Sequence, residues 1–442
     1  MEVKTGYLHK PYKSTRDSGL PWLGQIPVHW EVKRLKFVAP ASTNKLSDKP
    51  DDLPYVGLEN IESSTGRLLM ETQPESVESN VGIFKIGDIL FGKLRPYLAK
   101  VVQADFRGCC TTEILALQPK LGIDGRFLFY HLLSSRFIDT VNSMTYGTKM
   151  PRASWDQIGN LALSLPPLPE QRAIAAFLDE QTAKIDALIA KKQRLLELLA
   201  EQRSALISQT VTKGLNSDAE MKDSGIKWLG KIPEHWKVKR LKHVTNIMFS
   251  SVDKLTYESE KPVSLCNYVD VYKNDCINSD IEFMQASASA EEIRKFTLKK
   301  DDVMITKDSE SFNDIAIPAY VPSELENVLC GYHLALIRSK AIADGKFLFW
   351  ALKARPINYQ FEVEATGITR YGIDQYAIGN TYSLLPPFHE QHAIAAYLDC
   401  QTAKNDTLTA KVESAIERLR EYRSALISSA VTGKIDVRKE AS

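Results

Sequence analysis

An internal repeat constrains this chain more than any other feature of its sequence. Residues 17–38, DSGLPWLGQIPVHWEVKRLKFV, recur at 223–244 as DSGIKWLGKIPEHWKVKRLKHV, an offset of 206 with 16 of 22 positions identical. Residues 166–190, PPLPEQRAIAAFLDEQTAKIDALIA, recur from position 386 at an offset of 220. A duplication with so long a period predicts two equivalent structural units built on one scaffold.

The two copies are alike at their ends and different in their middles. Residues 39–84 and 245–298 show almost no likeness, and the two offsets make the second copy 14 residues longer between the repeated segments. A shared scaffold that carries two different recognition surfaces would give this pattern. Neutral drift of loops after an old duplication is the alternative explanation.

The composition is typical of a globular protein with more than one domain. A length of 442 residues predicts two to four domains, and the chain is 44% apolar and 25% charged without a low-complexity tract. No segment approaches ~18 uninterrupted apolar residues, and the N-terminus lacks the apolar stretch of a secretory signal, so we expect a cytoplasmic protein with no membrane association. Because the net charge is only +1, any DNA binding has to rest on local basic patches.

Each copy is predicted to form a mixed α/β domain. The shared opening places two tryptophans around a Gly-x-Ile-Pro turn, and we expect them to be core or docking residues: Trp22, Trp30, Trp228 and Trp236. The Val-Lys-Arg-Leu-Lys segment that follows alternates basic and apolar residues, which favours a strand. In the first copy, further strand-like runs are bounded by Gly, Pro and Asp at 54–58, 86–91, 99–102 and 112–117. Helices are expected near 126–135 and 346–354.

Each copy ends in an unusually long helical pattern. The patterns run from about Glu170 to Thr212 and from Glu390 to Thr432. A helix of about 43 residues is roughly 65 Å long, more than a small domain needs for its own core, so we interpret it as a spacer. If a two-fold axis relates the two units, the helices run antiparallel and hold the two globular domains at opposite ends.

The apolar residues of these helices predict a seam between them. Steps of four and three residues give a pattern that is typical of a two-helix coiled coil, although two separate amphipathic core helices are the alternative. The apolar seam positions are Ile174, Leu178, Ile185, Leu188, Leu195, Leu199, Leu206, Ile394, Leu398, Leu408, Val412, Leu419 and Leu426.

Motifs for catalysis are missing from the sequence. There is no GxxxxGK[ST] phosphate loop, no GxGxxG after a strand, and no histidine spacing typical of a metal site or a Ser/His/Asp triad. LPPL at 165–168 and LPPF at 385–388 resemble the Pro-Pro-aromatic loop of amino-methyltransferases but lack its leading Asn or Asp, so we interpret them as stiff hinges. The six cysteines show no CxxC spacing and are expected to be reduced and mostly buried.

Polar segments that contain basic residues recur at corresponding places of the two copies and are the candidate DNA-binding residues. Arg and Lys suit phosphates and guanine edges, Asn suits adenine, and Thr or Tyr can contact backbone or base. The first copy contributes GKLRPYLAK and YGTKMPRASW, with Lys93, Arg95, Tyr97, Lys100, Thr148, Lys149 and Arg152. The second copy contributes TKDSESFND and TGITRYGID, with Lys307, Ser309, Asn313, Thr369, Arg370 and Tyr371.

The layout resembles the specificity subunit of type I restriction-modification systems. The features that carry this resemblance are the duplicated WLGxIPxHWxVKRLK opening, the KLRPYL segment, the PPxxEQ helix starts and the endings RSALISQTVTKGL and RSALISSAVTGKIDV. The resemblance spans nearly the whole chain. The second copy departs from KLRPYL and reads TKDSESFNDIA, in which only Lys307 keeps the place of Lys93.

The resemblance implies an α+β protein: two mixed α/β target-recognition domains separated by two long conserved helices that form an antiparallel coiled coil, with an internal pseudo-two-fold repeat. The corresponding boundaries are 1–166 for the first recognition domain, 167–214 for the central conserved helix, 215–386 for the linker and second recognition domain, and 387–442 for the C-terminal conserved helix and tail.

The resemblance also implies a function without catalysis by this chain. Each domain is expected to read one half of an asymmetric, gapped site in double-stranded DNA, and the helices to dock two methyltransferase subunits, with restriction subunits joining the assembled complex. No cofactor is expected here, since S-adenosylmethionine, ATP and Mg²⁺ belong to partner subunits. A self-sufficient methyltransferase or nuclease and a coiled-coil scaffold with no DNA role are the alternatives.

Overall fold

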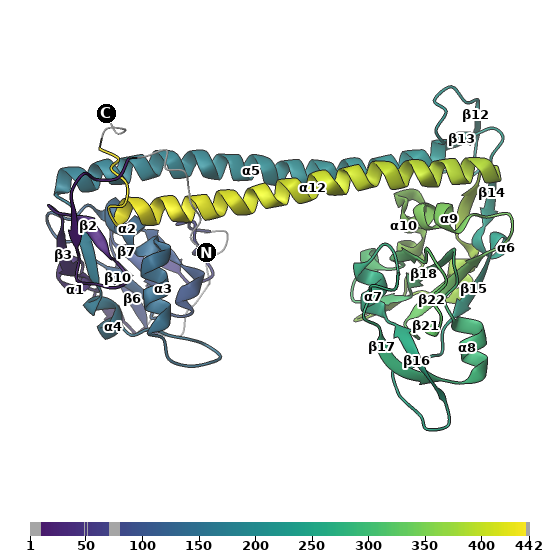
Figure 1. The fold of residues 1–442 in the computed structure, drawn as a ribbon, viewed down its shortest axis with the longest axis horizontal. Coiled ribbons are helices and arrows are strands. Elements are labelled where there is room, and N and C mark those ends of the chain that lie inside the picture. Colours follow the sequence, from purple (N-terminus) through teal and green to yellow (C-terminus); the bar gives the residue numbers. More distant parts are fainter. Residues whose placement is uncertain (1–9, 48, 51, 70–79, 439–442) are drawn as a thin grey trace. The chain divides into compact units, whose positions relative to one another are not determined.

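Two long helices, α5 (Leu168–Lys213) and α12 (Phe388–Val431), contain the repeated EQ and RSALIS segments (Figure 1). They belong to a computed structural model that describes residues 10–47, 49–50, 52–69 and 80–438. The chain divides into two units, of which the first consists of Met1–Gln193 and Glu413–Ser442 and the second of Arg194–Val412. Each long helix therefore begins in one unit and ends in the other.

Local sequence signals explain where both long helices begin and end. A Pro-Pro pair precedes each helix, and Glu170 and Glu390 place a carboxylate in the first turn, where the helix dipole stabilises negative charge. A glycine with positive φ follows each helix closely, Gly214 at +76° and Gly433 at +69°, as is common after a helix C-terminus. Both predicted helical ranges are confirmed to within two residues.

The first unit forms several small sheets. Strand β3 of the repeated opening pairs antiparallel with β11, the strand that leads into α5. The larger sheets have the strand orders β10-β7-β8 and β4-β6-β9-β5, and β5 is parallel to β9. The strands are β1 Thr15–Asp17, β2 Gln25–Pro27, β3 Glu31–Arg34, β4 Lys45–Leu46, β5 Tyr55–Val56, β6 Val81–Phe84, β7 Ile89–Gly92, β8 Val101–Gln103, β9 Gly108–Thr111, β10 Ile114–Leu117 and β11 Ala162–Leu165.

Short helices cover these sheets and complete the core of the first unit. The main apolar cluster joins Phe91 of β7 and Phe127 of the helix after the sheets to Phe177 in the first part of α5 and Val431 at the end of α12. Both long helices are thus part of this core. The short helices are α1 Leu35–Val38, η1 Pro96–Leu98, α2 Gly125–Leu133, α3 Ser135–Ser143 and α4 Trp155–Asn160.

The second unit repeats this plan with longer strands. Its main cluster joins Trp236 and Phe347 to Val211 near the end of α5 and Leu398 near the start of α12, and a second cluster lies around β16 and β17. The strands are β12 Met221–Asp223, β13 Lys231–Pro233, β14 Lys237–Arg240, β15 Thr245–Phe249, β16 Lys261–Cys266, β17 Met284–Ala288, β18 Asp302–Thr306, β19 Asp308–Ser309, β20 Pro318–Tyr320, β21 Val328–Cys330, β22 Leu334–Ser339, β23 Tyr371–Gly372 and β24 Tyr382–Leu385.

The second unit has counterparts of the five short helices described for the first, and two further helices between β16 and β18. The strand orders of its larger sheets are β15-β22-β18-β20 and β17-β16-β21. The helices are α6 Leu241–Val244, α7 Tyr268–Lys273, α8 Ala290–Phe296, α9 Gly345–Lys353, η2 Phe312–Asp314, α10 Arg355–Glu364 and α11 Gln375–Asn380. The mixed α/β character of both units and the helices expected near 126–135 and 346–354 are therefore confirmed.

The repeated opening differs in two respects from its sequence-based expectation. The strand ends at Arg34 and Arg240, because the leucine that follows turns inward as the first residue of a short helix, α1 or α6. Trp30 and Trp236 are fully buried, whereas Trp228 is 45% exposed. The second tryptophan of each opening is thus a core residue in both units.

The predicted seam is buried at most of its positions but not throughout. Leu188, Leu195 and Leu408 are exposed by 44%, 38% and 44%, respectively. Side chains that the seam did not include, such as Ile207 and Ile416, are buried instead. Near its ends a long helix packs on both the other helix and a globular domain, which requires a wider apolar stripe than a coiled-coil seam provides.

The compact units do not follow the predicted boundaries. Ranges 167–214 and 387–442 set the helices apart from the recognition domains, yet residues 168–193 and the end of α12 share the core of the first unit. Each long helix thus contributes its two ends to different cores, and the domain boundaries given above stay a prediction. Residues 1–9 and 439–442 of the predicted ranges lie outside the described residues.

Candidate nucleic-acid interface

The repeated His-Trp pair of each unit contacts the first-turn glutamate of a long helix. The Glu170 carboxylate accepts hydrogen bonds from the Trp30 indole (3.1 Å), the His29 imidazole (2.8 Å) and the Tyr12 hydroxyl (2.6 Å). In the second unit the Glu390 carboxylate likewise accepts from the rings of Trp236 and His235 (2.9 and 2.6 Å). These repeated residues therefore join the opening to the helix start in both units.

The glutamine after each glutamate positions a short helix of the globular domain. The Gln171 side chain accepts from the backbone N–H of Asp124 (2.8 Å), the N-cap residue of α2, and donates to the Pro166 carbonyl (2.9 Å). Gln391 accepts from the backbone N–H of Asp344 at the same distance, and donates to the Pro386 carbonyl. The PPxxEQ repeat thus fixes the same joint in both units.

The two candidate segments of the first unit lie beside each other. The backbone N–H of Arg95 donates to the Pro151 carbonyl (2.7 Å), and the N–H of Ala153 donates to the Lys93 carbonyl (3.0 Å). Tyr146 and Arg152 exchange two backbone hydrogen bonds and close a small hairpin, 146–152. Its tip is exposed, and Met150 has 61% of its surface accessible.

The second unit repeats this arrangement with different side chains. Strand β19 (Asp308–Ser309) pairs antiparallel with β23 (Tyr371–Gly372), which joins the two candidate segments. Thr366 and Gly372 close a hairpin, 366–372, whose tip residue Ile368 is 94% exposed. The two hairpins differ in position by 220 residues, as the long helices do, so they occupy matching places of the repeat.

Five candidates of the first unit lie on or next to its hairpin. Thr148 and Lys149 are exposed at the tip, and Tyr97 is 51% exposed on the neighbouring segment. Arg95, with φ of +51°, and Lys93 are half-buried beside it.

Two further candidates of the first unit have partners inside the domain. The Lys100 ammonium donates to the carbonyl oxygens of Leu58 (2.6 Å) and Ile61 (2.8 Å), and the Arg152 guanidinium pairs with Glu113 at 2.8 Å. Two of the three protons of the Lys100 ammonium are therefore donated to backbone carbonyls within the domain.

The second unit places its candidates differently. Thr369 and Arg370 are exposed on the hairpin, and Asn313 is exposed on the adjoining η2. Ser309, in contrast, is only 5% exposed, and the Lys307 ammonium lies 4.8 Å from the centre of the Phe249 ring. Tyr371 is half-buried, and the centre of its ring lies 5.9 Å from the centre of the Phe312 ring. The hairpin and η2 are thus the parts of this segment that face solvent.

Sequence reasoning missed a polar and aromatic cluster beside the second hairpin. The Asp308 carboxylate pairs with Arg370 (2.5 Å) and with the His333 ring (2.7 Å). Tyr268 and Tyr272 stack on α7 with ring centres 5.6 Å apart, and burial raises the pKa of Tyr268. The four-residue spacing of these tyrosines in a helix was the available signal, because it places both rings on one face.

The two hairpins offer different chemistry on the same scaffold. The hairpin of the first unit exposes Lys149 and Thr148, whereas Arg370 of the second unit pairs with Asp308, and the ring of the next residue, Tyr371, contacts that of Phe312. The major groove of DNA admits a two-stranded β-ribbon, and its base edges are distinguished by such polar side chains. The arrangement suits two readers with different base preferences.

Other kinds of site find little support in the described part of the chain. Within residues 10–438, apart from the gaps given above, no group of three or more His, Cys, Asp or Glu side chains is placed to hold a metal ion. None of the helices described is long and apolar enough to cross a membrane.

Comparison with known proteins gives consistent matches for both halves. The family model described as "Type I restriction modification DNA specificity domain" matches residues 27–198 and again 233–418. The putative type I restriction enzyme MjaX specificity subunit of Methanocaldococcus jannaschii is 27% identical over 445 residues, which covers 94% of this chain and 96% of that protein. The type I restriction enzyme EcoDI specificity subunit of Escherichia coli is 30% identical over 180 residues, 40% of this chain and 39% of that protein.

A solved structure supports the fold. The chain aligns with a TM-score of 0.65 and 18% identity to a chain from a study of complex assembly and conformational transition of the type I R-M system, covering 92% of this chain and 98% of that one. The two matches to the family model together span more than half of the sequence. The chain therefore belongs to the family of type I restriction-modification DNA specificity domains.

Proposed function

We propose that this chain is the DNA-recognition subunit of a type I restriction-modification complex and that each unit reads one half of an asymmetric, gapped site. The observation that carries the proposal is the pair of exposed hairpins, 146–152 and 366–372, at matching positions of the repeat. Each hairpin is hydrogen-bonded to the other candidate segment of its unit. Because the side chains at the two tips differ, the two half-sites differ as well.

The long helices supply the second part of the proposal. They act as an antiparallel pair that spaces the two readers and docks two methyltransferase subunits, through which restriction subunits join the complex. Within each unit the start of one long helix lies beside the end of the other, as the Asp186–Arg423 and Arg203–Asp406 ion pairs show. S-adenosylmethionine, ATP and Mg²⁺ act in the partner subunits, and this chain contributes DNA binding alone.

Selection from a random duplex library tests the two-reader model. The full chain with its modification subunits should enrich two short specified sequences separated by an unspecified gap of fixed length. Binding should weaken with salt, and each phosphate contact should add roughly 0.9 to the slope of log affinity against log salt. Enrichment of a single continuous motif would contradict the model.

The alternative functions predict different results. A self-sufficient methyltransferase or nuclease would methylate or cleave DNA as the isolated chain, whereas we expect neither reaction without partner subunits. A scaffold with no DNA role would show no salt-dependent duplex binding. Both outcomes can be read from the same purified chain.

A further inference from the structure

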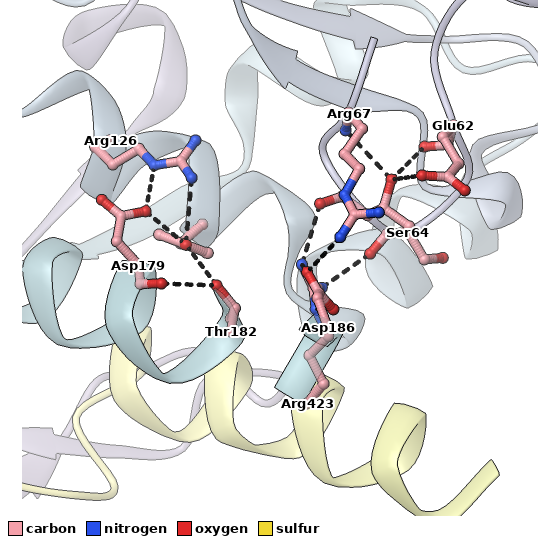
Figure 2. A network of polar contacts seen from close by, with 10 residues as sticks. Glu62, Ser64, Arg67, Arg126, Asp179, Thr182, Asp186 and Arg423 are labelled. Carbon is pink, nitrogen blue, oxygen red and sulfur yellow. Dashed lines mark hydrogen bonds and ion pairs between the residues drawn. The ribbon is translucent and has the colours of Figure 1, made fainter. Parts of the chain in front are cut away.

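A repeated arginine joins three elements of the first unit. The Arg423 guanidinium of α12 pairs with the Asp186 carboxylate of α5 (Nε–Oδ1 2.9 Å) and donates to the carbonyl oxygens of Ser64 and Thr65, both at 3.0 Å (Figure 2). Ser64 and Thr65 lie in a loop of the globular domain. The Arg423 side chain is buried. One guanidinium therefore connects both long helices with the recognition domain.

The second unit contains the same contact at the equivalent positions. Arg203 of α5 pairs with Asp406 of α12 at 3.2 Å, and these residues are offset by 220 from Arg423 and Asp186. Arg203 also pairs with Asp275 at 3.2 Å, in the loop after α7 of the recognition domain. The ion pair is thus retained, although the guanidinium of Arg203 donates its hydrogen bond to a loop carboxylate and that of Arg423 donates to Asp186 and to two loop carbonyls.

A repeated serine makes a second attachment five residues later. The Ser428 hydroxyl accepts from the backbone N–H of Ser135 (3.1 Å), and the Ser208 hydroxyl accepts from the backbone N–H of Arg355 (3.2 Å). These N–H groups open α3 and α10, whose own N-cap residues make no side-chain cap. The hydroxyl of the long helix therefore satisfies a backbone N–H in the first turn of a helix of the recognition domain, as an N-cap side chain does.

These contacts differ in kind from the apolar packing around them. Apolar burial has no preferred direction, so it permits small rotations of a domain on a helix. Hydrogen bonds weaken steeply away from linear geometry, and a guanidinium presents its donors in a rigid plane. A domain held by Arg423 and Ser428 at two points cannot rotate on its helices without breaking one of them.

We propose that the RSALIS arginines and serines are positioning residues that set the angle of each recognition domain on its helix segments: Arg423 and Ser428 in the first unit, Arg203 and Ser208 in the second. Through that angle they set the gap length that the complex accepts. The inference rests on the proposed function, because it needs two readers. None of the four residues lies on a hairpin, so base preference does not depend on them.

Replacement of each arginine by methionine tests this role in the full chain. Arg423→Met and Arg203→Met keep the length and helix propensity of the side chain and remove its donors. Arg420→Met and Arg194→Met are matched controls, because these arginines are exposed on the same helices and pair only with a glutamate three residues away. The duplexes contain the selected half-sites with the preferred gap and with gaps one base pair shorter or longer.

The expected result distinguishes an effect on the preferred gap length from an effect on base recognition. Both methionine variants should keep the bases of each half-site, while discrimination between the preferred gap and its neighbours falls about tenfold, or ~1.4 kcal/mol. Arg→Lys variants should recover part of this discrimination, because one donor and the charge remain. The control variants should behave as the unmodified chain does.

The positioning role and the proposed function are refuted by different outcomes. Folded Arg423→Met and Arg203→Met variants that discriminate gap lengths as well as the unmodified chain would refute the positioning role and leave the proposed function intact. An unmodified chain that selects no bipartite sequence would refute the proposed function itself. Where an arginine variant does not fold, Ser428→Ala and Ser208→Ala are tested in the same assay. Ser428→Ala removes the hydrogen bonds of its hydroxyl with the N–H and the hydroxyl of Ser135, and Ser208→Ala removes the one with the N–H of Arg355.

Discussion

Removal of one heptad from each long helix should shorten the gap between the two half-sites. Residues 189–195 of α5 and 414–420 of α12 lie between the ion pairs at Asp186–Arg423 and Arg203–Asp406, so both pairs survive the deletion. Seven residues shorten a helix by about 10 Å. At 3.4 Å per base pair this length corresponds to roughly three base pairs.

Rotation limits the affinity of the shortened complex. Removal of seven residues rotates the remainder of an α-helix about its axis by only ~20°. A gap that is three base pairs shorter rotates one half-site about the duplex axis, relative to the other, by roughly 105°. We therefore expect a preferred gap about three base pairs shorter, with both half-sites unchanged and binding weaker than that of the full-length chain.

The assay is the same duplex selection, with a library in which the gap length varies. Deletion of the heptad from α5 alone is the control, because it puts the two helices out of register and should abolish folding or selection. Thermal melting checks that the double deletion folds. A folded double-deletion variant that still selects the original gap would refute the spacer role of the helices.

Three further predictions concern single residues. Lys100→Met should lower the free energy of unfolding by about 2 kcal/mol in chemical denaturation, since it leaves the Leu58 and Ile61 carbonyls without their charged donor. Unchanged stability together with weakened DNA binding would instead indicate that Lys100 contacts DNA. Lys149→Ala should weaken binding at the first half-site and reduce the salt slope by roughly 0.9, and a loss confined to the second half-site would contradict the assignment. Burial lowers the pKa of His131 to about 4 from 6.5, so between these pH values the unfolded chain binds a proton that the folded chain does not. The free energy of unfolding should therefore fall by up to ~1.4 kcal/mol per pH unit as the pH decreases from 6.5 towards 4. His131→Gln should flatten this dependence between pH 6.5 and 5, and an equal slope in both proteins would exclude His131 as its source.

The long helices were predictable because their signals are local. The Pro-Pro pair, the first-turn glutamate and the closing glycine stand within a few residues of each helix end, and the apolar spacing continues between them. The strands of the variable middles carry no such signal. β4, β5 and β19 have two residues each, and long-range pairing fixes their register.

The candidate site was predictable as segments but not as individual side chains. Recurrence in both copies selected four segments that pair in space within their units. The role of each side chain depends on residues far away in sequence, as the contacts of Lys100 with Leu58 and Ile61 show. No local pattern indicated that Asp308 would neutralise Arg370.

The backbone carbonyls that accept hydrogen bonds from Arg423 would allow the first recognition domain to be replaced by a domain of different sequence. Ser64 and Thr65 contribute only backbone oxygen atoms to this contact, and every amino acid has such an oxygen. A foreign domain could therefore be grafted onto the same helices with any side chains in this loop, provided that its main chain follows the same path. The second unit is less permissive, because its attachment requires a carboxylate at position 275.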